Sequence, residues 1–397
     1  MRDEYDVIVV GAGPGGSTAA RTAAEECDVL LIEKRQEIGD PVRCAEGARR
    51  APLLEVLGLS EINEKWISSE INGARINAPD GTFVDITAEM LRLEDPFYYV
   101  LERKIFDRDL AKNAARAGAH IMVRTRATGL ILEDGAVKGV KMNRLGDDFE
   151  VRSKVVIGAD GVESQVGRWG GIDTTLKVKD IGSCAQYHME NVDILEKTVD
   201  IYLGERYSPS GYAWVFPKGE RAANIGLGIQ GSKLNAKRPI DYLNEFVADK
   251  FPHGQPVELV VGGVPVSDAL KTIVGDGLML VGDAAHHTEP MTGGGMPQAI
   301  SAGKTAGEIA RKAVRQNDAS VKVLGEYETE WHNSPFGKQR TRMYKAKEFF
   351  FERSDEELSR MVRAVQGVRP EEMTMRGVAM HVLKNDPRLM LMIRHLL

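Results

Sequence analysis

The sequence predicts an α/β protein in which a domain built on a parallel sheet is interrupted by an antiparallel sheet and followed by C-terminal helices. A strand, a glycine-rich turn and a helix open the chain, alternating segments fill residues 183–264, and a buried strand with a long helical segment follows residue 265. The first domain is therefore expected to be discontinuous. We assign to it residues 1–75, 96–182 and 265–335, to an antiparallel-sheet substrate domain residues 76–95 and 183–264, and to a C-terminal helical region residues 336–397.

Length and composition exclude several classes of protein. The chain has 397 residues, and its 43% hydrophobic content and net charge of −6 exclude a disordered or collagen-like chain. Its cysteines, Cys27, Cys44 and Cys184, are too widely spaced for structural zinc, a disulfide scaffold or a CxxC dithiol oxidoreductase. No apolar run approaches the length of a membrane span, so we expect a cytoplasmic protein. We expect neither a nucleic-acid partner nor a bound metal.

The first strand, turn and helix have the pattern of a Rossmann-type dinucleotide site. Strand-like residues 5–10 and 28–33 flank the Ala-rich helical segment 17–26, and Glu33 stands 22 residues after the first glycine of the turn. The first glycine permits the turn, the second lets a pyrophosphate approach the backbone, and the third lets helix pack on strand. The acid would accept hydrogen bonds from a ribose. The turn consists of Gly11, Ala12, Gly13, Pro14, Gly15 and Gly16. The alternative is a glycine-rich turn without a ligand.

A second GxGxxG string, residues 226–231, lies inside an alternating strand and opens no convincing helix. We do not interpret it as a second dinucleotide site. Without a second βαβ unit there is no obvious NAD(P)H domain, so electrons are expected from elsewhere or from a transient visit to the surface.

Two later strands also end in an aspartate, Asp160 before Gly161 and Asp283 after Gly282. Each would lie at the carboxyl edge of the parallel sheet, where ligands bind, although each alone is equally compatible with a helix cap. Residues 290–296 form a glycine loop that opens the helical segment 297–315. Its amides would suit negative charge that develops on a reduced flavin.

Together with Arg103, these motifs resemble the FAD-binding fold of the aromatic-hydroxylase superfamily and, within it, the geranylgeranyl reductases. The resemblance is greatest to archaeal digeranylgeranylglycerophospholipid reductases and covers nearly the whole chain. It implies a Rossmann-type FAD-binding domain, FAD as cofactor, and a geranylgeranylated glycerophospholipid as substrate. It further implies a set of FAD-contacting residues, namely Gly11, Ala12, Gly13, Pro14, Gly15, Gly16, Glu33, Lys34, Cys44, Ala45, Gly47, Arg103, Ala127, Asp160, Gly161, Asp283, Gly294, Gly295 and Met296.

The loop Arg43 to Gly47 occupies the position that runs beside the flavin ring in these reductases. Cys44 is therefore the candidate catalytic residue. From the residues alone, a small buried cysteine that fills space is the more common arrangement.

Residues 209–217 resemble the PxxYxWxFP signature of the same reductases. The period of a strand places Tyr212, Trp214 and Phe216 on one face. That face could line a slot for a polyprenyl chain or pack in the core. Spacing alone favours core packing, whereas the resemblance favours the slot.

Residues 340–397 carry twelve Lys and Arg against eight Asp and Glu, a net charge of +4. With its methionines and Phe349, Phe350 and Phe351, this region would let the protein bind a membrane surface peripherally. A buried helix with basic flanks is the alternative for the three phenylalanines. His286 and His287 beside Glu289 invite a metal interpretation, which we reject because neighbours in sequence need not point to one centre.

The chemistry implied is saturation of geranylgeranyl double bonds by hydride transfer from reduced flavin. The electron donor is unidentified; a ferredoxin or a reductase would serve. One alternative is an FAD-dependent monooxygenase of an aromatic or polyketide substrate, because the FAD motifs are shared. Another is a non-enzymatic prenyl-lipid carrier, which would need no flavin.

Overall fold

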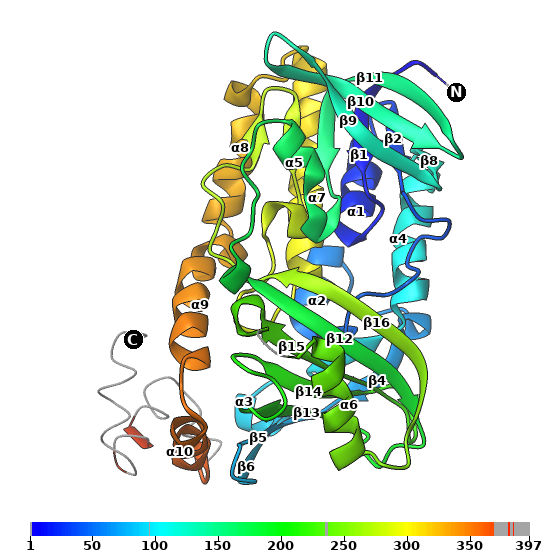
Figure 1. The fold of residues 1–397 in the computed structure, drawn as a ribbon. Coiled ribbons are helices and arrows are strands. Elements are labelled where there is room, and N and C mark those ends of the chain that lie inside the picture. Colours follow the sequence, from blue (N-terminus) through cyan, green and yellow to red (C-terminus); the bar gives the residue numbers. More distant parts are fainter. Residues whose placement is uncertain (1, 95, 235–236, 369–379, 382–383, 385–397) are drawn as a thin grey trace.

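The computed structural model describes residues 2–94, 96–234, 237–368, 380, 381 and 384. Figure 1 shows two main sheets, one above the other, with helices α8, α9 and α10 following one another down one side. The predicted fold class is confirmed: a Rossmann-like domain, an antiparallel sheet and C-terminal helices. No helix in these described ranges is long and apolar enough to cross a membrane.

The upper sheet carries the glycine-rich turn. Its strand β1 (Glu4–Val10) pairs in parallel with β2 (Val29–Ile32) on one side and β11 (Asp147–Gly158) on the other. Where both faces are covered, at residues 7–10, 29–32 and 155–157, these strands are continuous in buried apolar residues. The remaining strands of this sheet are β8 (His120–Met122), β9 (Thr125–Glu133), β10 (Ala136–Arg144), β17 (Val274–Gly275) and β18 (Leu278–Leu280).

Helix α1 (Pro14–Ala23) packs tightly on α7 (Met296–Gln316), which matches the predicted helical segment 297–315. The approach depends on small residues, since a Cβ at Gly303 would lie 2.2 Å from the carbonyl oxygen of Gly15. The glycine turn and the glycine loop that opens α7 therefore lie side by side. The other helices of this half are α4 (Arg103–Arg116), α5 (Gln165–Trp169) and α8 (Val321–Asn333).

The lower sheet has seven strands, all antiparallel to their neighbours except at the β13–β5 pair. Helix α6 (Pro239–Lys250) packs on β12 and β15. In sheet order the strands are β16 (Gln255–Pro265), β12 (Ile181–Glu190), β15 (Ala223–Gln230), β14 (Tyr212–Pro217), β13 (Thr198–Leu203), β5 (Gly73–Asn77) and β6 (Phe83–Thr87). Strand β5 thus joins this sheet from Gly73, so the predicted boundary between residues 75 and 76 cuts through a strand.

A small third sheet, which the sequence did not predict, joins the two halves. Its strands are β3 (Gly47–Arg49), β7 (Tyr98–Leu101) and β4 (Ile67–Ile71). Short helices α2 (Arg50–Leu57) and α3 (Ala88–Leu91) flank these connections. Strand β3 begins at the last residue of the Arg43–Gly47 loop, which therefore lies between the two large sheets.

The C-terminal part begins with α9 (Pro335–Phe351) and α10 (Asp355–Val365). A proline at the first position of α9 follows the end of α8, as expected for a break there. Most of the predicted helical region beyond residue 368 lies outside the described residues.

Candidate functional site

The glycine turn has the geometry of a dinucleotide site. Gly11 has a φ of +104°, and its Cβ would lie 2.3 Å from the carbonyl oxygen of Ala159. A Cβ at Gly16 would lie 1.9 Å from the carbonyl oxygen of Gly11. A Cβ at Gly13 would meet no atom within 4 Å. The first and third glycines therefore permit backbone packing, and the second leaves space for a ligand.

Glu33 lies beside this turn at the end of β2. Its carboxylate accepts hydrogen bonds from the backbone N–H groups of Ala12 and Arg35, each at 3.0 Å. Of two other predicted FAD contacts, Lys34 forms an ion pair with Glu163 at 3.4 Å, and Ala127 lies in β9. Six predicted residues do not line the cleft that the others share, namely Gly11, Ala12, Glu33, Lys34, Ala127 and Asp160.

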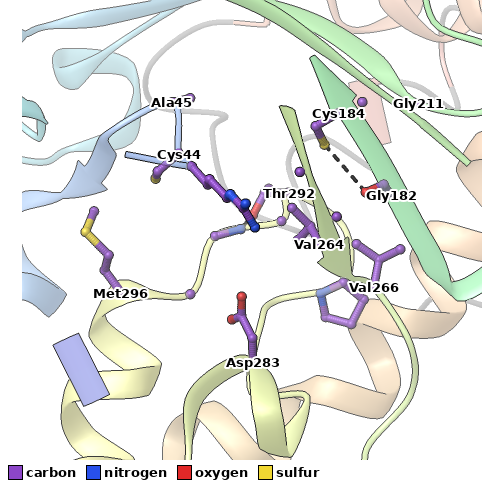
Figure 2. Close-up of a pocket in the computed structure, with 18 of the residues that line it drawn as sticks. Cys44, Ala45, Gly182, Cys184, Gly211, Val264, Val266, Asp283, Thr292 and Met296 are labelled. Carbon is purple, nitrogen blue, oxygen red and sulfur yellow. Dashed lines mark hydrogen bonds between the residues drawn. The ribbon is translucent and has the colours of Figure 1, made fainter. Parts of the chain in front are cut away.

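That cleft lies between the two large sheets and encloses a cavity of about 390 Å³. Figure 2 shows Cys44 and Ala45 on one side, Gly182 and Cys184 of β12 on the other, and Asp283 and Met296 below. Sixteen predicted residues from distant parts of the chain line it, namely Gly13, Pro14, Gly15, Gly16, Cys44, Ala45, Gly47, Arg103, Gly161, Tyr212, Trp214, Phe216, Asp283, Gly294, Gly295 and Met296. One cleft thus joins the glycine turn to the aromatic strand.

Two aspartates provide acceptors: Asp283 lines the cleft, and Asp160 lies beside the glycine turn. Burial raises the pKa of Asp283. The hydrogen bond that Thr288 Oγ1 donates at 2.9 Å lowers this pKa and offsets only part of the rise. Burial likewise raises the pKa of Asp160, whose Oδ2 accepts from Val166 N at 3.1 Å. Its Oδ1 has no hydrogen-bond partner among the described residues. An orphaned buried acceptor beside an open glycine turn fits a dinucleotide, whose ribose hydroxyls donate.

Arg103 opens helix α4 next to the Cys44 loop. Its guanidinium donates two hydrogen bonds to Asp107, at 2.7 and 2.8 Å. Although burial alone would lower the pKa of Arg103, the negative charge of Asp107 raises it above its ordinary value. The side chain is thus a fixed cation in the cleft wall, already paired with its own helix.

Two thiols line the cleft, and both are protonated at neutral pH. Burial raises the pKa of Cys44 above its ordinary 9.0, against the opposing effect of Arg103. Burial raises the pKa of Cys184 to about 12. Neither is therefore an activated thiolate. The Cys44 loop is packed closely, since a Cβ at Gly47 would lie 2.3 Å from the ring of Phe216.

The aromatic strand β14 forms both cleft wall and core. Tyr212, Trp214 and Phe216 all line the cleft, as the strand period predicts, and Trp214 and Phe216 also belong to a buried cluster. The second glycine string makes room for them. A Cβ at Gly226 would lie 2.6 Å from the Trp214 ring, and one at Gly228 would lie 3.1 Å from Cys184 Sγ.

Helix α9 closes one side of the cleft, which the sequence analysis missed. Lys347, Glu348, Phe351 and Glu352 line it, and the Phe351 ring stacks on Tyr212 with centroids 6.4 Å apart. The signal available was the spacing of Lys347 and Phe351, one helical turn apart on one face.

Contacts at both ends of α9 fix it to the rest of the molecule. Arg340 is buried and donates to the carbonyl oxygens of Thr288 and Ser267. Lys347 forms an ion pair with Asp180 at 3.4 Å and donates to the carbonyl oxygen of Val266 at 2.9 Å.

The two adjacent histidines point to different partners. His286 lies within hydrogen-bond distance of Ser267 Oγ at 2.8 Å and of the Thr174 carbonyl oxygen at 3.2 Å. The His287 ring stacks on Trp331 with centroids 3.7 Å apart. Burial lowers the pKa of His286 to about 4 and that of His287 well below its ordinary value. Both are therefore neutral packing residues near pH 7.

Comparison with known proteins agrees with this geometry. A family model described as geranylgeranyl reductase catalytic domain matches residues 180–264, and one described as NAD(P)-binding Rossmann-like domain matches residues 9–48. A digeranylgeranylglycerophospholipid reductase of Methanocella arvoryzae is 53% identical, covering 98% of each chain. The chain belongs to this reductase family. The corresponding protein of Methanosarcina mazei is 48% identical over 98% of this chain and 95% of its own.

Solved structures show the same fold in this family and beyond it. A geranylgeranyl bacteriochlorophyll reductase-like protein from Thermoplasma acidophilum is 38% identical, with a TM-score of 0.91 over the whole of both chains. A flavin-dependent brominase is 18% identical, with a TM-score of 0.71 over 99% of this chain and 93% of its own, and shares the fold alone. The resemblance inferred from the sequence motifs, and with it an oxidoreductase of this family, is confirmed.

Proposed function

We propose that this chain binds FAD and saturates the geranylgeranyl double bonds of archaeal glycerophospholipids. The observation that carries the proposal is the single cleft that joins a dinucleotide turn to an aromatic strand. Bound FAD, once reduced, supplies a hydride from its ring. The residues of the chain hold both reactants, exclude water and provide a proton.

Cofactor binding is assigned to the glycine-rich end of the cleft. Open space at Gly13 and the free acceptor at Asp160 suit the pyrophosphate and a ribose. Asp283 and the loop that ends at Gly295 and Met296 line the adjacent part of the cleft, where backbone N–H groups at the start of α7 suit negative charge.

Substrate binding is assigned to the apolar end. An isoprenoid tail offers no polar atoms, so its position depends on shape and on excluded water. Tyr212, Trp214 and Phe216 supply broad rigid surfaces, and Val260 and Val264 of β16 line the same space. Because an alkene accepts hydride poorly, holding the reacting carbon close to the donor matters more than an acid–base pair.

We assign the proton to Cys44 Sγ. Reduction of one double bond adds one hydride and one proton, and Cys44 is a cleft residue whose thiol stays protonated at neutral pH. Solvent would return the proton after each turnover.

We also propose that the protein meets its lipid at a membrane surface as a peripheral cytoplasmic protein and receives electrons from a separate donor, such as a ferredoxin or a reductase. The support is chemical, because the substrate resides in a bilayer. Residues 226–230 of the second glycine string lie within strand β15 and do not form a strand–turn–helix unit.

Anaerobic single turnover tests the function. The FAD-loaded protein is reduced, mixed with geranylgeranylated glycerophospholipid, and followed by flavin reoxidation and product mass. We expect reoxidation coupled to a gain of two hydrogen atoms per double bond. Reoxidation that requires oxygen and inserts an oxygen atom would establish the monooxygenase alternative. Purified protein that binds the lipid but no flavin would establish the carrier alternative.

A further inference from the structure

The Cys44 loop is held by two buried amide side chains of the antiparallel sheet. Gln186 of β12 and Asn224 of β15 point to the same face, since Asn224 pairs with His188, two residues from Gln186. Gln186 is 6% exposed and Asn224 is 2% exposed. Gln186 Nε2 donates to the carbonyl oxygen of Cys44 at 3.0 Å. Asn224 Nδ2 donates to Glu46 Oε2 at 2.8 Å.

Each amide has a second partner that fixes its orientation. The indole N–H of Trp214 donates to Gln186 Oε1 at 2.9 Å. An indole N–H can only donate and a backbone carbonyl can only accept, so Gln186 satisfies both partners in one orientation. His188 Nδ1 lies 3.0 Å from Asn224 Oδ1 and occupies the other amide in the same way. A carboxylate at position 186 would leave two acceptors facing each other.

Glu46 anchors the other end of the loop. It is buried, has a φ of +71°, and accepts from Arg103 N at 2.9 Å and from Lys218 Nζ at 2.8 Å. Its own backbone N–H donates to Cys44 Sγ at 3.2 Å. The thiol is therefore held by a residue that is itself held by the sheet.

We propose that Gln186 and Asn224 are positioning residues that hold the Cys44 thiol in place, and that Trp214 acts on Cys44 through Gln186. This inference rests on the proposed function for its catalytic consequence. Trp214 thus has a role beyond forming the cleft wall: its indole N–H orders the loop across the cleft. Neither amide is hydrogen-bonded to the thiol, so Gln186 acts through the Cys44 carbonyl group and Asn224 through the Glu46 side chain.

The test measures the thiol directly. The FAD-loaded protein is alkylated with iodoacetamide, and the rates at Cys44 and Cys27 are read by peptide mass spectrometry. Cys27 lies in the Rossmann-like half and serves as an internal reference. We expect Gln186→Met to raise the Cys44 rate about tenfold with the Cys27 rate unchanged, as loss of one buried hydrogen bond implies. Gln186→Glu keeps the side-chain volume and should also raise the Cys44 alkylation rate.

Trp214→Phe keeps an aromatic ring and removes the indole N–H, so it should also raise the Cys44 alkylation rate. The double variant with Gln186→Met should react at nearly the same rate as Gln186→Met alone. Asn77→Leu is the matched control, because Asn77 donates to Ile201 O at 3.2 Å within the same sheet and has no contact with the loop. Its Cys44 rate should equal that of the unmodified protein.

A Cys44 rate that stays unchanged in both Gln186 variants, with FAD content retained, overturns the inference even if lipid turnover falls, since Gln186 would then act on the substrate directly. Altered alkylation with normal lipid reduction supports the positioning role and removes Cys44 from the proposed chemistry. The two failures are therefore distinguishable.

Discussion

The two glycine strings of this chain, residues 11–16 and 226–231, share one pattern and perform different tasks. In the first, Gly13 leaves space that no atom of the described chain fills, and the turn joins a strand to a helix. In the second, Gly226 and Gly228 lie within strand β15, and the space they leave is taken by Trp214 and Cys184. A glycine pattern therefore indicates close approach, and the neighbouring elements decide whether a ligand or a side chain approaches.

The largest effect is expected from Gly16→Ala. The new Cβ would lie 1.9 Å from the carbonyl oxygen of Gly11, and neither backbone segment can move away easily. We expect the free energy of unfolding to fall by about 3 kcal/mol. We also expect the purified protein to contain less bound FAD. Denaturant unfolding and the flavin absorbance of the purified protein measure both. Retention of full stability would show that the turn is looser than described.

Gly226→Ala should distinguish the role of the second glycine string from that of the first. Its Cβ would meet the Trp214 ring at 2.6 Å, but a side chain can shift where backbone cannot. We expect a loss of about 1–2 kcal/mol in stability, retained FAD and strongly reduced lipid turnover. Flavin titration alongside turnover tests this. Loss of FAD with normal lipid binding would contradict the assigned roles.

Gly13→Ala should weaken FAD binding and leave the stability of the protein nearly unchanged, the reverse of what we expect for Gly226→Ala. With no atom within 4 Å of the new Cβ, the unfolding free energy of the FAD-free protein should stay within about 0.5 kcal/mol of the original. FAD affinity should fall about tenfold or more, because the added methyl group obstructs the pyrophosphate. Titration of the FAD-free protein measures the affinity. Unchanged affinity would place the phosphates elsewhere.

The smallest effect concerns pH. If Cys44 supplies the proton as a neutral thiol, its raised pKa keeps it competent through neutral pH, and the rate should fall only as pH rises beyond the ordinary thiol value of 9.0. Single-turnover rates between pH 6 and about 10 test this. Cys44→Ser should lack that alkaline decline. A rate that falls between pH 7 and 8 would contradict a buried neutral thiol.

Features that depend on residues close together in the sequence could be predicted. The β1–α1–β2 unit follows from Gly11 to Glu33, and the shared face of Tyr212, Trp214 and Phe216 follows from strand period. The residue assignments to FAD remain predictions, although most of those residues meet in one cleft.

Features that depend on distant partners were not predictable. Gln186 is unremarkable in sequence, and only its hydrogen bonds to Trp214 and Cys44 reveal it. Strand β5 pairs with β13 across more than a hundred residues of chain, so local pattern could not assign β5 to the antiparallel sheet.

Helix α9 supplies one wall of the cleft, and among the described elements that line the cleft it is the last to leave the ribosome. Until Lys347 pairs with Asp180 and Phe351 stacks on Tyr212, the aromatic end of a nascent molecule stays open along that side. The apolar part of the cleft is thus enclosed late in synthesis, after the strands that line it have been made.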